Sequence, residues 1–214
     1  FSGYFKNFVF ISAGQVDNMS VYIVDYSKGK WAGVNKNDQY DPASMLKVPV
    51  MIAYYHAAEK NPALLSQQIA FNGDDQNTDE YFRSPDNIVP GKYYTTEQLI
   101  ESMIVNSDNT ALVLLTQSME PAELAKVYSD LELPLPGNEP KVQYLSAELY
   151  AFFFRILYNG TYLSHEYSEK ALTLMMKSNI PGIRSGVPEG VEVAQKFGER
   201  TTYDQYKTKT DQEL

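Results

Sequence analysis

Ser44 and Lys47 have the spacing of a nucleophile and its base. They stand three residues apart at the start of Ser44 to Lys60, where apolar residues recur at helical spacing. Residues i and i+3 lie on one face of a helix, so the two side chains come within reach of each other. A serine hydroxyl is a poor nucleophile until a base takes its proton. A lysine amine is such a base only when partly neutral, and burial beside another cation lowers a lysine pKa to about 7–8. The pair therefore predicts acyl-transfer chemistry.

Two later triplets, Ser107-Asp108-Asn109 and Lys196-Phe197-Gly198, contain groups that such a reaction also needs. In the first, the serine is a candidate proton shuttle and the asparagine a candidate amide donor. In the second, the lysine is a candidate second cation, and the glycine would let a substrate backbone approach closely. The N–H groups of Ser44 and Glu199 are candidate donors to the oxyanion of a tetrahedral intermediate, where one donor is worth roughly 10²–10³ in rate. Together these residues describe a serine site that works without histidine.

Each motif also has a simpler interpretation. Ser44 is suited to cap a helix, and Lys47 to lie on a solvated helix face. Ser, Asp and Asn favour turns, so the second triplet fits a turn with an N-cap. The third fits a strand end with a surface lysine. The S-x-x-K spacing also occurs by chance in this chain, at Ser27 to Lys30. Only the ordered combination of the motifs therefore carries the prediction.

The composition argues against several kinds of protein. The chain has 214 residues, no cysteine, two histidines and a formal net charge of −9. The lack of cysteine excludes disulfides, thiol nucleophiles and cysteine metal sites, and two histidines exclude a histidine-rich metal centre. We expect neither a metal nor a cofactor. Interspersed charges with a negative balance argue against a nucleic-acid surface. No apolar run is long enough to span a bilayer, and the absence of a G-x-S-x-G turn disfavours a Ser-His-Asp hydrolase.

The hydrophobic pattern predicts strands at both ends of the chain and helices between them. Thr95 and Gln98 form a capping box, Glu120-Pro121 marks a turn, and Asn159-Gly160 ends an apolar helix. The predicted strands are 19–24 and 31–34, which form a hairpin, and 191–194; the predicted helices are 44–60, 95–105, 111–119, 146–157 and 168–176; 72–92 is turn-rich and 131–141 is a loop. We expect an α/β sheet lobe (1–41 and 186–214) interrupted by a helical lobe (42–185), with the site in the cleft between them.

The motifs, in this order, resemble those of the penicillin-recognising serine hydrolases, which are the class A β-lactamases and the D-Ala-D-Ala peptidases. They match S-x-x-K, S-D-N and K-[ST]-G, and the resemblance extends from Val21 to Glu199. It implies a β-lactamase/transpeptidase-like fold of class α/β (α+β), with an antiparallel sheet lobe and a helical lobe. It also implies roles for individual residues: Ser44 as nucleophile, Lys47 as base, Ser107 as proton relay, Lys196 as charge, and Asn109, Gly198 and Glu199 in substrate binding.

Departures from the family pattern affect the predicted activity. Phe197 replaces the hydroxyl residue that helps to hold a substrate carboxylate, and Arg184 and Arg200 are candidates to compensate. No E-x-x-L-N segment supplies a base for the deacylating water, because Glu132 and Glu139 fit a solvated loop. Deacylation should therefore be slow. The polar stretch 200–214 lacks the further strands and final helix of the family. These elements are expected to be missing by truncation, because a half-sheet would expose its edges; the alternative is that another chain completes the sheet.

The sequence thus predicts a serine acyl-enzyme hydrolase acting on amide, peptide or ester bonds, with β-lactams or D-Ala-type compounds as substrates. The alternative is a catalytically weak relative that binds a cell-wall peptide in the same cleft. A purely structural wall-associated domain would leave the clustered motifs unexplained. The expected partner is a small-molecule or peptide substrate, with no nucleic acid and no transmembrane segment, for a monomer or weak oligomer. An extracytoplasmic location suits such substrates, although no signal is visible in this chain.

Overall fold

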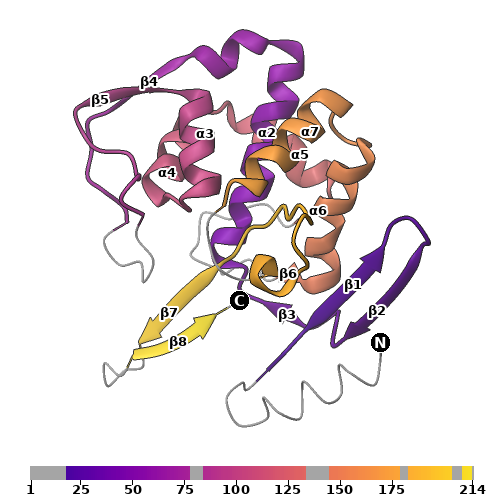
Figure 1. Cartoon of the computed structure of the whole chain (residues 1–214). Coiled ribbons are helices and arrows are strands. Elements are labelled where there is room, and N and C mark those ends of the chain that lie inside the picture. The colour runs from indigo at the N-terminus through magenta and orange to yellow at the C-terminus, as the bar shows by residue number, and fades with distance from the viewer. Residues whose placement is uncertain (1–17, 78–83, 134–144, 179–182, 204–208, 214) are drawn as a thin grey trace.

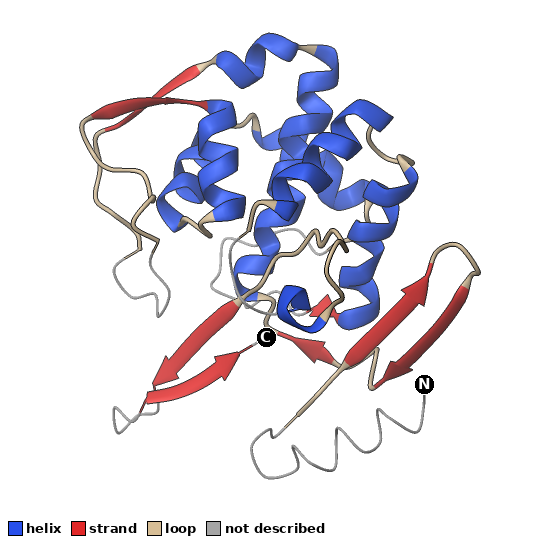
Figure 2. Ribbon diagram, in the orientation of Figure 1, coloured by secondary structure: helices blue, strands red, loops and turns tan. Residues whose placement is uncertain are grey.

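Helices form the body of the molecule, and short pairs of strands lie along its edges (Figures 1 and 2). The computed structural model describes residues 18–77, 84–133, 145–178, 183–203 and 209–213. The α-helices are α2 (Lys47–Lys60), α3 (Thr96–Val105), α4 (Asn109–Ser118), α5 (Pro121–Asp130), α6 (Ala147–Asn159) and α7 (His165–Met176), with 3-10 turns η1 (Ala43–Leu46), η2 (Pro62–Ser66) and η3 (Ile183–Gly186). The strands are β1 (Val21–Asp25), β2 (Lys30–Val34), β3 (Gln39–Tyr40), β4 (Gln68–Phe71), β5 (Lys92–Thr95), β6 (Leu145–Ser146), β7 (Glu199–Tyr203) and β8 (Lys209–Glu213). The predicted mixed α/β class is confirmed.

Helix α2 is the centre of the core. Every residue from Lys47 to Tyr55 is buried, and the helix packs against α3, α4, α5 and α7. A helix that is apolar all round belongs in an interior. Tyr54 donates a 2.7 Å hydrogen bond to the Leu115 carbonyl of α4, and burial raises the pKa of Tyr54, which keeps this donor protonated. Because Lys47 is the first residue of α2, the core fixes the position of its backbone.

Local sequence signals define several helix ends. At α3, the Gln98 N–H donates to Thr95 Oγ1 at 3.1 Å and the Thr95 N–H donates to Gln98 Oε1 at 2.8 Å, which confirms the predicted capping box. Helix α6 begins after Ser146, whose Oγ accepts from the Leu149 N–H at 3.2 Å. It ends at Gly160, which has a left-handed φ of 58°. The predicted end of this helix is therefore confirmed as well.

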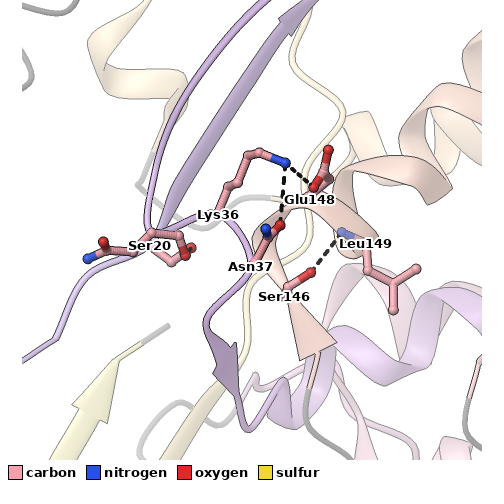
Figure 3. Close-up of polar contacts among 7 residues, drawn as sticks. Ser20, Lys36, Asn37, Ser146, Glu148 and Leu149 are labelled. Carbon is pink, nitrogen blue, oxygen red and sulfur yellow. Dashed lines mark hydrogen bonds and ion pairs between the residues drawn. The ribbon is translucent and has the colours of Figure 1, made fainter.

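A polar link joins the N-terminal strands to α6. Lys36, shortly after β2, donates to Glu148 in the first turn of α6 and to Asn37 Oδ1 at 3.3 Å (Figure 3). Beside this link, β3 pairs with β6 through Gln39↔Ser146 and Tyr40↔Leu145. Strand β1 also contacts α6. These contacts hold the segment that leads into η1 against the start of α6.

The described strands form four separate antiparallel pairs, rather than the one sheet expected of a sheet lobe. Strand β1 pairs with β2 from Val21↔Val34 to Asp25↔Lys30, which confirms the predicted N-terminal hairpin. The other pairs are β3–β6, β4–β5 and β7–β8. The division into a sheet lobe and a helical lobe at residues 41/42 and 185/186 stays a prediction.

The elements that the sequence analysis did not predict include α5 and the strand pair β4–β5. Glu120-Pro121 is not merely a turn but the start of α5, where the proline lies in the first turn and its missing N–H costs no helical hydrogen bond. Strands β4 and β5 flank the turn-rich segment 72–92 and pair from Gln68↔Thr95 to Phe71↔Lys92. Neither strand has the alternating apolar pattern by which strands are recognised.

The strand predicted at 191–194 is wrong. Residues 191–198 have no regular secondary structure. The Val191 N–H donates to the Pro188 carbonyl at 3.3 Å, and the Gln195 N–H donates to the Met175 carbonyl of α7 at 3.4 Å. Strand β7 begins only at Glu199, and it pairs with β8 from Glu199↔Glu213 to Tyr203↔Lys209. The polar composition of 200–214 did not predict this hairpin. In the part of the chain that the structure describes, no helix is long and apolar enough to cross a membrane.

Candidate active site

Ser44 and Lys47 meet at the N-terminal end of the central helix. Ser44 lies in η1, directly before α2, and Lys47 is the first residue of α2. Lys47 Nζ lies 2.9 Å from Ser44 Oγ, and Lys47 is only 1% exposed. The cap positions of η1 and α2 belong to Pro42 and Leu46, so Ser44 caps neither element. Both simpler interpretations, a capping serine and a solvated lysine, are therefore wrong.

Ser107 places its hydroxyl between two lysine amines. Lys47 Nζ lies 3.1 Å from Ser107 Oγ and also donates to the Ser107 carbonyl oxygen, while Lys196 Nζ lies 2.9 Å from the same Oγ. Ser107 is 3% exposed and Lys196 is 7% exposed. Lys196 is therefore not the surface lysine of the simpler interpretation. The structure joins Ser44, Lys47, Ser107 and Lys196 in one chain of hydrogen bonds, which we call the serine–lysine cluster.

Two non-glycine residues of this region have left-handed backbone conformations. Ala43, immediately before Ser44, has a φ of 44°, and Ser107 itself has a φ of 57°. Asp41 Oδ1 accepts from the Ala43 N–H at 2.9 Å and helps to hold the first of these conformations. A left-handed conformation of a non-glycine residue costs of order 1–3 kcal/mol, and such residues are concentrated at functional sites. Here one of them lies in the turn that carries the Ser44 hydroxyl, and the other is Ser107 itself.

Asp108 supports the turn that carries Ser107. It is fully buried, and it is the N-cap of α4, which agrees with the simpler interpretation of this triplet as a capped turn. Its carboxylate accepts hydrogen bonds from the Ile88 N–H at 2.8 Å, the Ser102 hydroxyl at 2.9 Å, the Asn77 amide at 3.0 Å and the Ala111 N–H at 3.1 Å. Sequence reasoning missed Asn77 and Ser102, because no motif connects these separate segments.

Gly198 occupies a place that admits no side chain. A Cβ added there would lie 2.4 Å from the Pro42 carbonyl oxygen and 3.1 Å from the Met45 nitrogen. Real Cβ atoms essentially never come as close to another atom as the first of these distances. The sequence suggested that this glycine makes room for a substrate. Its close neighbour in the structure is the turn that carries Ser44, so the glycine lets the end of segment 191–198 pack against that turn. The predicted role of Gly198 in substrate binding stays a prediction.

The other predicted substrate-binding residues are close in sequence to members of the cluster, Asn109 to Ser107 and Glu199 to Lys196. Asn109 begins α4 and is half-buried, and its N–H donates to Asn77 Oδ1 at 2.7 Å. Glu199 begins β7. Their assigned roles, an amide donor for substrate and an oxyanion donor, stay predictions.

Arg184 and Glu132, two of the residues considered as substitutes for missing family features, lie away from the cluster. Arg184 is exposed, and its guanidinium donates to the carbonyl oxygens of Met176 and Val193. Glu132 is exposed and lines a cavity of about 500 Å³ between β1 and α6, to which no residue of the serine–lysine cluster contributes. Glu139 and the Arg200 side chain lie outside the described part of the chain.

A second cavity, of about 370 Å³, lies beside α3 and also excludes the cluster. In the described residues, no group of three or more His, Asp or Glu side chains is arranged to hold a metal.

His56 of α2 stacks on Tyr162 with ring centroids 5.3 Å apart, and its Nδ1 lies 3.9 Å from Glu123 Oε2. It is a packed residue of the helical body rather than a partner of Ser44.

Comparisons with known proteins bear on the family and the fold. The chain matches the model of the beta-lactamase enzyme family over residues 4–208. No curated protein matches it. A class A beta-lactamase from Mycobacterium abscessus has a similar structure, with a TM-score of 0.74, 18% identity, and coverage of 95% of this chain and 86% of the other. A beta-lactamase from Sphaerobacter thermophilus is similar with a TM-score of 0.67, 23% identity, and coverage of 85% and 70%. A mutant of PBP-A, solved as an acyl-enzyme complex with penicillin G, has a TM-score of 0.72, 19% identity, and coverage of 90% and 76%. These likenesses establish the fold.

Proposed function

Because the chain belongs to the beta-lactamase enzyme family, we propose that it is a serine hydrolase that forms an acyl-enzyme on Ser44. Its substrates would be amides, peptides or esters, with β-lactams and D-Ala-type peptides as the first candidates. The observation that carries this proposal is the position of the Lys47 amine, which is buried and lies 2.9 Å from Ser44 Oγ and 3.1 Å from Ser107 Oγ. A base must lie within hydrogen-bond reach of the proton that it removes, and this amine does.

Acylation would begin at the Lys47 amine. Burial and the nearby Lys196 cation favour its neutral form, which takes the Ser44 proton as Oγ attacks the substrate carbonyl carbon. The resulting oxyanion would be held by the N–H groups of Ser44 and Glu199. Ser107 would then pass a proton to the leaving nitrogen or oxygen and recover one from Lys47 as the bond to the leaving group breaks. The acyl group remains on Ser44, and Lys47 returns to its neutral state.

Deacylation would be the slow step. Water must lose a proton as it attacks the ester, and this requires a base beside the acyl group. Glu132 lines the cavity between β1 and α6 instead, with an exposed side chain. Phe197 also supplies no hydroxyl for a substrate carboxylate. We therefore expect weak turnover of β-lactams and a long-lived acyl-enzyme.

The second candidate is a relative that binds a cell-wall peptide without efficient catalysis. Phe197 and the position of Glu132 away from the cluster favour it, whereas the intact hydrogen-bonded serine–lysine cluster favours catalysis. In either case the ligand is a small molecule or peptide, encountered outside the cytoplasm where such substrates occur.

Covalent labelling separates these candidates. The protein is incubated with a fluorescent penicillin, and the adduct is located by intact-mass spectrometry and peptide mapping. Labelling should be lost in Ser44→Ala and kept in Ser27→Ala, because Ser27 has the same S-x-x-K spacing but lies exposed in the β1–β2 turn. If a penicillin, an activated ester and a phosphonate probe all leave the unaltered protein unlabelled, acyl transfer is refuted and binding alone remains.

A further inference from the structure

Phe197 contacts the Lys196 ammonium through both its backbone and its ring. Lys196 Nζ donates a 2.9 Å hydrogen bond to the Phe197 carbonyl oxygen, and the same nitrogen lies 4.4 Å from the centroid of the Phe197 ring. The phenyl ring is half-buried and the lysine is 7% exposed. An ammonium within about 6 Å of an aromatic centroid is attracted by the ring quadrupole, and the attraction is larger when water is excluded.

These contacts also bear on Ser107. A lysine has a flexible four-carbon stem and three rotatable donors, so its head group stays in one place only when several partners hold it. Lys196 donates to Ser107 Oγ at 2.9 Å, to the Phe197 carbonyl, and faces the ring. An N–H donated by Lys196 occupies a lone pair of the Ser107 hydroxyl, so the Ser107 proton must turn away from Lys196. The ring therefore helps to set the direction in which Ser107 offers its proton.

We propose that Phe197 is a positioning residue, whose aromatic face holds the Lys196 ammonium on Ser107 and thereby speeds acylation of Ser44. The inference rests on the proposed acyl-transfer function. It assigns a purpose to the aromatic side chain that stands between Lys196 and Gly198. Phe197 does not touch the reacting atoms in this scheme; it acts through Lys196.

The test compares a ring-keeping variant, Phe197→Tyr, with two that keep apolar volume without a ring, Phe197→Leu and Phe197→Met. Acylation by a fluorescent penicillin is followed at increasing concentration, which separates the maximal rate from the half-saturating concentration. We expect Phe197→Leu and Phe197→Met to lower the maximal rate about tenfold at an unchanged half-saturating concentration. Phe197→Tyr should restore the rate of the unaltered protein. A purely structural role of Phe197 would not lower the maximal rate while leaving the half-saturating concentration unchanged, and Phe197→Tyr would not be expected to restore that rate specifically.

A second measurement does not depend on activity. Protons above an aromatic face resonate upfield, so the Lys196 ε-methylene protons, assigned with Lys196→Arg, should be shifted upfield in the unaltered protein and in Phe197→Tyr. The shift should disappear in Phe197→Leu. A normal ε-methylene shift in the unaltered protein overturns the inference, as does a full acylation rate in both ringless variants. Absence of labelling in the unaltered protein refutes the proposed function instead, and a persistent upfield shift then still supports the placement of Lys196 by Phe197.

Discussion

Gly198 packs so closely on Pro42 that a methyl group on its α-carbon would lie 2.4 Å from the Pro42 carbonyl oxygen. The turn that follows Pro42 carries Ser44, and the segment before Gly198 carries Lys196. The contact therefore ties the two halves of the serine–lysine cluster together through backbone rather than side chains.

Gly198→Ala should displace the Ser44 turn. The added methyl group must push η1 away, since the backbone oxygen that it meets has no freedom to rotate aside. We expect the loss of about 1–3 kcal/mol in the free energy of unfolding that overpacking costs, together with strongly reduced penicillin labelling. Urea unfolding and labelling measure both. Gly186→Ala is the matched control, because a Cβ there meets no atom within 4 Å; equal labelling of both variants would contradict the role given to Gly198.

Asp108→Ala should destabilise the protein more than most single substitutions. The change leaves the Ile88 and Ala111 N–H groups and the Ser102 hydroxyl without their acceptor in a buried place. The Asn77 amide loses one acceptor but keeps Asp75 Oδ1 at 2.7 Å. Each buried unpaired donor costs about 1–3 kcal/mol, so we expect a loss of at least about 3 kcal/mol, measured by urea unfolding. The exposed Asp74→Ala should change stability by no more than about 0.5 kcal/mol. A loss of similar size at both positions would show that the buried network contributes little.

Two substitutions of Ser107 should separate stability from chemistry. Both Ser107→Ala and Ser107→Gly remove the hydroxyl that bridges Lys47 and Lys196, so both should lower the acylation rate by about 10²-fold or more. Because residue 107 has a φ of 57°, glycine should relieve a backbone penalty of about 1 kcal/mol that alanine retains. Ser107→Gly should therefore unfold at a higher temperature than Ser107→Ala. If Ser107→Gly is acylated at the rate of the unaltered protein, the hydroxyl is not needed and residue 107 matters only through its backbone conformation.

The acyl-enzyme formed with a penicillin should persist after the free compound is removed. This follows because Glu132, a glutamate considered as a deacylation base, lies away from the serine–lysine cluster. Intact-mass spectra taken over time report the fraction of protein that still carries the adduct. Glu132→Gln should not change the lifetime, because Glu132 is exposed and lines the cavity between β1 and α6. Rapid loss of the adduct in the unaltered protein but not in Glu132→Gln would identify Glu132 as the missing base.

Short-range features of this molecule were predictable from the sequence. The Thr95–Gln98 capping box, the Gly160 helix end and the β1–β2 hairpin depend on residues a few positions apart, and the structure confirms each of them. Prediction failed where a local pattern needs a distant partner. Residues 191–194 were predicted as a strand, but they pair with none of the described strands, and the next residue, Gln195, bonds to the Met175 carbonyl of α7.

The candidate site divides in the same way. Ser44 and Lys47 are three residues apart, and helical geometry alone brings them within reach. Lys196 meets Ser107 across 89 residues of chain, and Lys47 meets Ser107 across 60. The sequence determined which groups were available and the family to which the chain belongs. The tertiary structure alone decided that the buried amines of Lys47 and Lys196 both contact the Ser107 hydroxyl. This depends on the packing of α2 inside the helical body and of Gly198 against Pro42, because contacts between distant segments form only when the whole core excludes water.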